Sequence, residues 1–343
     1  MKRYQGLGTV ATYILFLSLT LLFVIPLSSC TSKTKFKVGF LHPSESRKRF
    51  VNEGRFMAAQ VRELGGEAIV KGANDDEKLQ LEQGYQMLEE GVSTLVICPI
   101  NTNTIAPLVR AAQKQGVDVI AYIRIVHNTT FTAFLATDNE YMASVWVESA
   151  LSLSPTGNYV IIGGDRFDEN AVLEMNAIER LLKPEVETGK VNIVFKGYTD
   201  GWNKGLAAYN IEKVANAYGN KIDAIISCND EMADGAISVL KEMGLEGKVP
   251  VTGQDADLVG ARNVVKGYQT VTFFHPSKEL GVQAANLAFA LYQGKKASAI
   301  TPDRTFNGVA EIPTIKVQSV SITKDNVDVL IQNGLYKKGE IYE

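Results

Sequence analysis

The chain has 343 residues, 45% of them hydrophobic and 21% charged, with a formal net charge of −3 at pH 7. This composition is typical of a globular protein, and the length suits two domains better than one. The mildly acidic charge argues against a nucleic acid as partner. The few histidines lack the spacing of a metal site, and no metal is expected. Cys98 and Cys228 each follow an apolar run, which predicts buried free thiols rather than a disulfide.

The first thirty residues have the layout of a secretory signal. Lys2 and Arg3 precede a long apolar run, which is followed by the sequence Leu27-Ser28-Ser29-Cys30. This last tetrapeptide resembles the lipobox of bacterial lipoproteins, in which the cysteine becomes the acylated first residue. A retained membrane anchor is the alternative, because the apolar run is of marginal length for one.

We interpret residues 1–29 as a lipoprotein signal peptide, Cys30 as the lipidated residue, and 30–35 as a polar tether. The mature protein is then extracytoplasmic and lipid-anchored to a bacterial membrane, at its periplasmic face or at the cell surface. Residues 1–29 are left out of the fold prediction.

After the tether, short apolar runs alternate with amphipathic stretches. Strands are predicted at 36–41, 68–71, 94–98 and 117–122. Between the last two, the spacing i, i+3, i+4, i+7 predicts a helix with one buried face, marked by Ile105, Leu108, Val109 and Ala112.

The same alternation continues in the second half. Strands are predicted at 159–162, 191–195, 224–227 and 249–252. Helical stripes follow, at Ala233, Ala236, Ile237 and Leu240, and again at Leu280, Ala284, Leu287 and Leu291. Continuous apolar strands between helices indicate parallel sheets covered on both faces. Two such series predict an α/β protein of two doubly wound parallel-sheet domains with a cleft between them.

Polar and aromatic side chains follow the predicted strands, where open α/β sheets bind ligands. Gln254 and Asp255 follow the apolar 249–252, and others of this kind are Arg49, Phe50, Arg124, Asp168, Asn170, Trp202, Asn229 and Asp230. Planar carboxylate, amide and guanidinium groups can each bond two neighbouring hydroxyls, and an aromatic ring can cover the C–H face of a pyranose. The set therefore suits a neutral polyhydroxylated ligand such as a sugar.

Each of these residues also has a structural interpretation. Asp168, Asn229 and Asp230 stand where helix N-caps are common. Phe50 lies on a helical stripe and could be core, while Arg49 belongs to a basic run that could be a solvated face. The sugar hypothesis depends on the recurrence of such residues at successive strand ends.

Motifs of catalysis and of cofactor binding are not recognised in the sequence. The first predicted strand is not followed by a glycine-rich dinucleotide fingerprint, and no Walker loop or nucleophile elbow is present. We therefore expect a protein that is not an enzyme and needs no cofactor. The carboxylates could form a glycosidase pair, but no spacing supports one.

Six short stretches carry a family resemblance: Lys37-Val38-Gly39, Asp138-Asn139-Glu140, Gly157-Asn158-Tyr159, Asp200-Gly201-Trp202, Lys221-Ile222-Asp223-Ala224 and Gly253 through Asp257. Through them the chain resembles the xylose-binding branch of the ribose/galactose-type (type I) periplasmic sugar-binding proteins. The resemblance covers nearly everything after the tether. It implies the periplasmic binding protein type I fold, in which two domains joined by three crossovers close on one sugar.

The resemblance also implies sugar ligands at positions that match in residue type: Arg49, Arg124, Asp168, Asn170, Trp202, Asn229 and Asp255. Phe50 replaces a tryptophan of the family and still permits stacking. Ile123 replaces an aspartate, and His275 replaces a lysine that precedes a proline. These last two departures leave the identity of the sugar open.

By the same resemblance, crossings are expected near residues 138, 274 and 309. The N-terminal lobe is then 36–138 plus 274–308, and the C-terminal lobe is 139–273 plus 309–343.

The expected function is that of a monomeric, lipid-anchored monosaccharide-binding protein that delivers its sugar to a membrane ABC permease. A membrane sensor kinase is the alternative partner, with this protein as its sugar receptor. A transcription repressor can share this fold, but the lipobox and the lack of an N-terminal helix-turn-helix argue against it. A secreted glycosidase is the remaining alternative.

Overall fold

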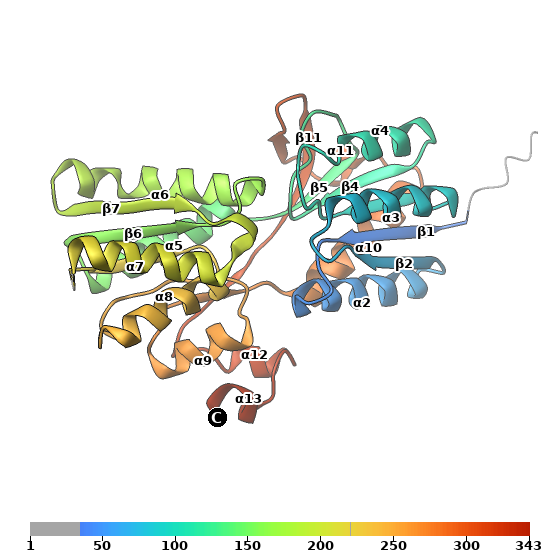
Figure 1. Cartoon of the computed structure of the whole chain (residues 1–343). Helices are drawn as coiled ribbons and strands as arrows, with labels where there is room; N and C mark the ends of the chain where they lie inside the picture. Colours follow the sequence, from blue (N-terminus) through green and yellow to red (C-terminus); the bar gives the residue numbers. More distant parts are fainter. Residues whose placement is uncertain (1–34, 220) are drawn as a thin grey trace, which may run out of the picture. The chain divides into compact units, whose positions relative to one another are not determined.

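The computed structural model describes residues 35–219 and 221–343 of the chain. The predicted signal peptide and Cys30, the predicted lipidation site, lie outside the described residues. The described part forms two lobes, one built on a seven-stranded sheet and one on a three-stranded and a two-stranded sheet, and three segments of chain run between the lobes (Figure 1).

The N-terminal lobe is built on a seven-stranded sheet with the order β10-β11-β5-β4-β3-β1-β2. Its strands are β1 (Lys37–His42), β2 (Glu67–Gly72), β3 (Thr94–Ile97), β4 (Asp118–Tyr122), β5 (Ala133–Thr137), β10 (Arg304–Phe306) and β11 (Glu311–Val317). All neighbours pair in parallel except β10 with β11.

Helices cover both faces of this sheet, which explains why its central strands read as continuous apolar runs. Val96 and Ile120 pack on one face with α2 (Lys48–Glu63) and α10 (Ser277–Tyr292). Leu95 and Val119 point to the other face, where they meet α3 (Glu77–Glu89) and α4 (Ala106–Lys114). The short α11 (Ala297–Ile300) precedes β10.

The C-terminal lobe contains the parallel order β7-β6-β8, made of β6 (Gly157–Gly163), β7 (Val191–Tyr198) and β8 (Ala224–Ser227). Two parallel bridges, Ile225 with Val251 and Thr252 with Val271, continue the pairing toward β9 (Thr272–Phe274). β9 in turn pairs antiparallel with β12 (Val320–Ile322). The predicted strand at 249–252 is therefore present only as isolated bridges.

Helices of this lobe pack in pairs against the sheet, α5 beside α6 and α7 beside α8. Their bounds are α5 (Asn139–Leu153), α6 (Glu169–Glu187), α7 (Lys204–Tyr218), α8 (Asp230–Glu242) and α9 (Leu258–Lys266), with the 3-10 turn η1 (Asp200–Trp202) and the C-terminal α12 (Val329–Gln332) and α13 (Lys338–Tyr342). In the part of the chain that the structure describes, no helix combines the length and apolar character needed to cross a membrane.

The chain passes between the lobes from β5 to α5, from β9 to α10, and from β11 to β12. The third crossing, predicted near Val309, lies after Val317, so this part of the prediction is wrong. The reason is that 314–317 pairs in parallel with β5 and belongs to the first sheet. The sequence does not predict this strand because it contains Pro313 and Lys316, and proline and lysine are depleted in strands.

Cys98 and Cys228 are both buried free thiols, as predicted.

Candidate functional site

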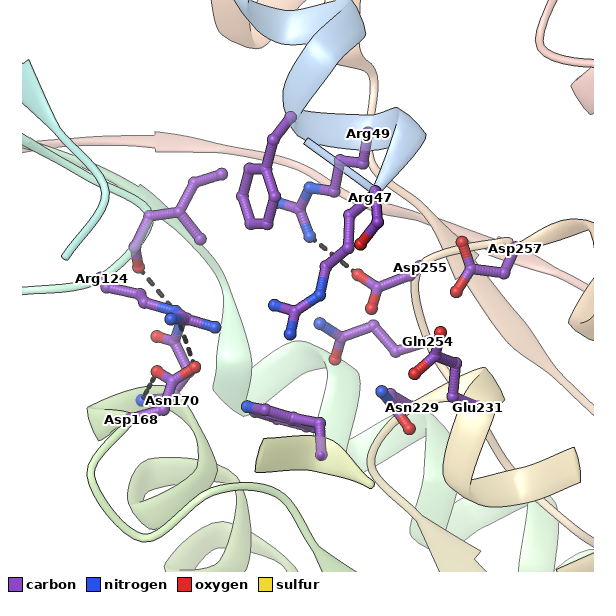
Figure 2. A pocket seen from close by; sticks show the side chains of 14 residues that line it. Arg47, Arg49, Arg124, Asp168, Asn170, Asn229, Glu231, Gln254, Asp255 and Asp257 are labelled. Atoms are coloured by element: carbon purple, nitrogen blue, oxygen red, sulfur yellow. Dashed lines mark hydrogen bonds and ion pairs between the residues drawn. The ribbon is translucent and has the colours of Figure 1, made fainter. Parts of the chain in front are cut away.

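One cavity of about 90 Å³ gathers the predicted ligand residues from both lobes (Figure 2). The predicted residues that line it are Arg49, Phe50, Ile123, Arg124, Asp168, Asn170, Trp202, Asn229 and Asp255. Gln254, which the sequence also singled out, lies beside them. Sequence reasoning missed the lining residues Ser46, Arg47, Glu231 and Asp257. Arg47 belongs to the same basic run as Arg49, and Asp257 ends the stretch that begins at Gly253. The sequence does not show in which direction these two side chains point.

Two of the lining residues also cap a helix N-terminus with their side chains. Asp168 caps α6, where its Oδ1 accepts a hydrogen bond from Asn170 N at 3.1 Å. Asn229 caps α8, where its Oδ1 accepts from Met232 N at 2.9 Å. In Asn229 the cap uses the amide oxygen and leaves the NH2 group for other bonds, so this residue can be both a cap and a ligand. In Asp168 the second oxygen, Oδ2, is taken by Arg124.

Arg124 and Asp168 join the two lobes across the cavity. Arg124 Nε lies 2.7 Å from Asp168 Oδ2, and Arg124 Nη1 donates to Pro99 O at 3.1 Å. Burial alone would lower the pKa of Arg124, but Asp168, together with the smaller effects of Cys98 and Asp75, outweighs burial and raises that pKa. Next to this pair, Asn170 donates to the carbonyl oxygen of Ile123 at 3.2 Å, which adds a second link between the lobes.

Arg49 and Asp255 form a second ion pair between the lobes. Arg49 Nη1 donates to Asp255 Oδ1 and Arg49 Nε donates to Glu53 Oε1, each at 2.9 Å. Burial would raise the pKa of Asp255, but His275 and Arg49 together hold it well below its usual range. Asp255 is therefore an ionised acceptor beside the cavity, with Oδ1 engaged by Arg49.

Trp202 and Phe50 supply the aromatic surfaces of the cavity. The indole packs so closely on Gly164 that a Cβ there would lie 2.2 Å from the ring atom Cη2. Phe50 belongs to the first lobe's core and also stacks on His42, with ring centroids 6.2 Å apart. Phe50 is thus both core and cavity wall, as its two sequence interpretations allowed.

Backbone strain is concentrated at this site. Ile123, Trp202 and Asp255 have φ of 63°, 56° and 90°, in the left-handed region that favours glycine. A branched residue such as Ile123 is rare there, because its Cβ substituents crowd the backbone. Such strain persists where the surrounding structure enforces it, most often at functional sites.

His275 does not line the cavity, contrary to the expectation from the resemblance. It is buried behind Asp255, where its Nδ1 lies 2.8 Å from Ser319 Oγ and its Nε2 lies 3.5 Å from Asp255 Oδ1. Burial lowers the pKa of His275 to about 4, so the ring is neutral near pH 7. The resemblance gave its position in the chain but not the direction of its side chain.

The wall contributed by the C-terminal lobe is acidic. Burial, together with the charges of Asp255 and Glu231, raises the pKa of Asp257 to about 7. Asp230 lies behind this wall and holds the loop in place, because its carboxylate accepts from Asp257 N at 2.9 Å and from Gln269 Nε2 at 2.6 Å. Asp230 is accordingly a structural residue, as the N-terminal position in α8 suggested.

Several polar atoms of the cavity are buried without a hydrogen bond: the acceptor Gln254 Oε1 and the donors Trp202 Nε1 and Arg49 Nη2. A buried polar group without a partner is costly, so these atoms favour a ligand that offers both donors and acceptors. Within residues 35–219 and 221–343, no group of histidine, cysteine or acidic side chains is arranged to hold a metal ion.

Comparison with known proteins gives a consistent result. The sequence model of a family described as periplasmic binding protein domain matches residues 38–296. The D-xylose-binding periplasmic protein of Escherichia coli is 33% identical over 307 residues, covering 89% of this chain and 92% of that protein. The protein of the same name from Haemophilus influenzae is 30% identical over 326 residues, covering 94% and 98%.

Among solved structures, an ABC transporter solute-binding protein from Clostridium phytofermentans with bound β-D-glucose superposes with a TM-score of 0.81. It is 26% identical to this chain, and the match covers 89% of this chain and 99% of that one.

Proposed function

The chain belongs to the periplasmic binding protein family, and we propose that it binds a monosaccharide in the cavity between its lobes. In this proposal it is an extracytoplasmic, lipid-anchored receptor that closes on the sugar and hands it to an ABC permease. It performs no catalysis itself. We place the lobes at 36–138 plus 275–317 and at 139–274 plus 318–343, with the cavity where they meet.

The observation that carries the proposal is the make-up of the cavity. Donors and acceptors from both lobes converge with two aromatic rings, and the buried polar atoms of Gln254, Trp202 and Arg49 lack hydrogen bonds. A sugar ring offers hydroxyls that both donate and accept, and C–H faces that suit an aromatic ring. The names of the relatives, which specify D-xylose, and the glucose bound to the Clostridium protein support the same class of ligand.

The choice of transport over sensing depends on the relatives. The Clostridium protein, 26% identical, is named as a solute-binding protein of an ABC transporter. Deletion of this protein would separate the two partners. If the partner is a permease, the deletion should abolish uptake of the sugar. If the partner is a sensor kinase, the deletion should change gene induction by the sugar and leave uptake by an expressed permease intact.

A thermal-shift panel tests the proposal. The purified protein is heated with D-xylose, L-arabinose, D-ribose, D-glucose, D-galactose, L-fucose or L-rhamnose, each at millimolar concentration. A sugar present at a hundredfold over its dissociation constant stabilises the fold by about 2.7 kcal/mol. At least one sugar should give such a shift, and in Asp255→Ala the stabilisation at the same sugar concentration should fall to about half or less. A panel without any stabilising sugar contradicts the proposal.

The lipid anchor has its own test. Cys30→Ala removes the thiol that acylation needs, so the variant should leave the membrane fraction or keep its leader. Fractionation and intact mass measure this. Unchanged membrane association with unchanged mass rules out lipidation at Cys30.

A further inference from the structure

Two of the segments that cross between the lobes are joined by one buried side chain. His275 lies between β9 and α10, and Ser319 lies between β11 and β12. Their side chains meet at 2.8 Å, from His275 Nδ1 to Ser319 Oγ, and both residues are 2% exposed. His275 therefore connects two of the crossing segments, which is where a hinge motion of the lobes would be taken up.

The other ring nitrogen of His275 faces the ligand cavity's wall. Nε2 lies 3.5 Å from Asp255 Oδ1, the same oxygen that accepts from Arg49 of the opposite lobe. Nε2 makes no hydrogen bond at this distance, although it is buried. A neutral ring with its proton on Nε2 can accept from Ser319 at Nδ1 and can donate to the ionised Asp255 carboxylate when the two side chains approach more closely. Ser319, His275 and Asp255 then form a chain of contacts from the crossing segments, which we call the hinge, to the cavity.

Asp255 itself is held in an unfavourable backbone conformation, with φ of 90°. A residue in that region stays in place only where its surroundings fix it. Arg49 fixes it from the other lobe, and His275 is the group that contacts its carboxylate from the hinge. If the lobes part to release a ligand, Arg49 would move away with its lobe, whereas His275 lies on the crossing segment next to Asp255.

We propose that His275 is a positioning residue that holds Asp255 in place for the ligand. Through its contact with Ser319, it also couples occupancy of the cavity by the ligand to the hinge. The inference depends on the proposed function, since it assigns a role toward the same sugar. It predicts that His275 affects affinity only by way of Asp255, without touching the ligand.

A double-mutant cycle with two sugar probes, D-glucose and D-xylose, tests this coupling by calorimetry. His275→Leu should weaken binding about tenfold, because Asp255 loses the polar group that contacts its carboxylate from the hinge. Asp255→Asn should weaken it by at least as much. The double variant should be no weaker than Asp255→Asn alone, because coupled residues are not additive.

Two further variants separate positioning from packing. His275→Gln keeps an N–H that can reach Asp255, and it should bind within about threefold of the unmodified protein even if its melting temperature falls. Ser319→Ala should weaken binding several-fold. Ser321→Ala is the matched control two residues further along, on β12, and should change nothing.

The outcomes are distinct. If the unmodified protein binds neither probe nor any sugar of the panel, the proposed function fails and the coupling fails with it. If the sugar binds but the losses from His275→Leu and Asp255→Asn add up, His275 acts independently of Asp255 and this inference alone is overturned. Equal binding by His275→Leu and the unmodified protein overturns it as well.

Discussion

The two ion pairs that cross the cavity differ in how far they are open to water. The side chains of Arg124 and Asp168 are 9% and 3% exposed, and Asp168 also caps a helix. In the other pair, Arg49 is 10% exposed but Asp255 is 25% exposed and stands on a strained loop. Although the family resemblance implies that all four residues bind the sugar, we propose that the first pair belongs mainly to the scaffold, while the second leaves a carboxylate accessible to a ligand. Two arginine–aspartate pairs thus have different roles in one cavity. We call Arg124 and Asp168 its structural side and Arg49 and Asp255 its recognition side.

The largest effect is expected on stability, when a residue of the structural side is replaced. Asp168→Ala leaves Arg124 buried without its partner and removes a helix cap, which should lower the free energy of unfolding by about 3–5 kcal/mol. Chemical denaturation measures this loss. Asp168→Asn is the matched variant, because its amide oxygen retains the cap and isolates the effect of charge. A loss below about 1 kcal/mol in Asp168→Ala would show that the pair is not structural.

On the recognition side, binding should change more than stability. Asp255→Ala removes an acceptor of sugar hydroxyls and should weaken affinity about tenfold to a hundredfold. The free energy of unfolding should change by less than about 1 kcal/mol, because this side chain is partly exposed. Calorimetry and denaturation on the same sample decide it. Unchanged affinity with a lowered melting temperature would assign Asp255 to the scaffold instead.

A further prediction concerns which sugar binds most tightly. It depends on Ile123, which lines the cavity next to Arg124. Isoleucine accepts no hydrogen bond, and a facing hydroxyl left unpaired costs about 1–3 kcal/mol. D-xylose should therefore not be the tightest sugar of the unmodified protein. Ile123→Asp should raise its affinity about tenfold, helped by the better tolerance of aspartate for positive φ.

Competition between D-xylose and the other sugars measures both statements. D-xylose emerging as the preferred ligand refutes the first. Since His275 lies outside the cavity, the specificity argument depends on Ile123 alone, and an Ile123→Asp variant without any gain would remove it.

The smallest effect on stability concerns another link between the lobes. His127 Nε2 lies 3.1 Å from Glu169 Oε2, and this hydrogen bond raises the pKa of His127 above its ordinary 6.5. The raised pKa means that the contact stabilises the fold fully below about pH 6.5, and that the gain is lost as pH rises through the higher folded value. We expect about 1 kcal/mol or less, because both side chains are partly exposed.

Unfolding at pH 5.5 and at pH 8.5 measures this contribution. His127→Gln should lose the difference that the unmodified protein shows, and Glu169→Gln should lose it equally. A pH profile that is the same in all three proteins would mean that His127 is not the responsible group.

Much of the fold could be predicted because parallel strands buried on both faces leave continuous apolar runs. The prediction failed where pairing, rather than composition, makes the strand. β11 contains Pro313 and two charged residues, and it is a strand because β5 and β10 lie on either side. The strand β5 itself was not predicted, and without it β11 had no place in the first sheet. The third crossing was misplaced for this reason.

The candidate site was predictable to the extent that strand ends share one edge of a sheet. This rule brought Asn229 and Asp255 together from the sequence. It does not give the direction of side chains, so Glu231 and Asp257 were missed and His275 was placed in the cavity. The strain at Ile123 was not predictable either, because a positive φ depends on the surrounding structure.

The most direct test of a sugar held between the lobes is a crystal structure of the protein grown with the sugar that gives the largest thermal shift. The account predicts one sugar in the cavity, hydrogen-bonded to side chains of both lobes that include Asp255 and Asn229, with its ring against Trp202. A sugar bound at the outer surface, or contacting one lobe only, would contradict it.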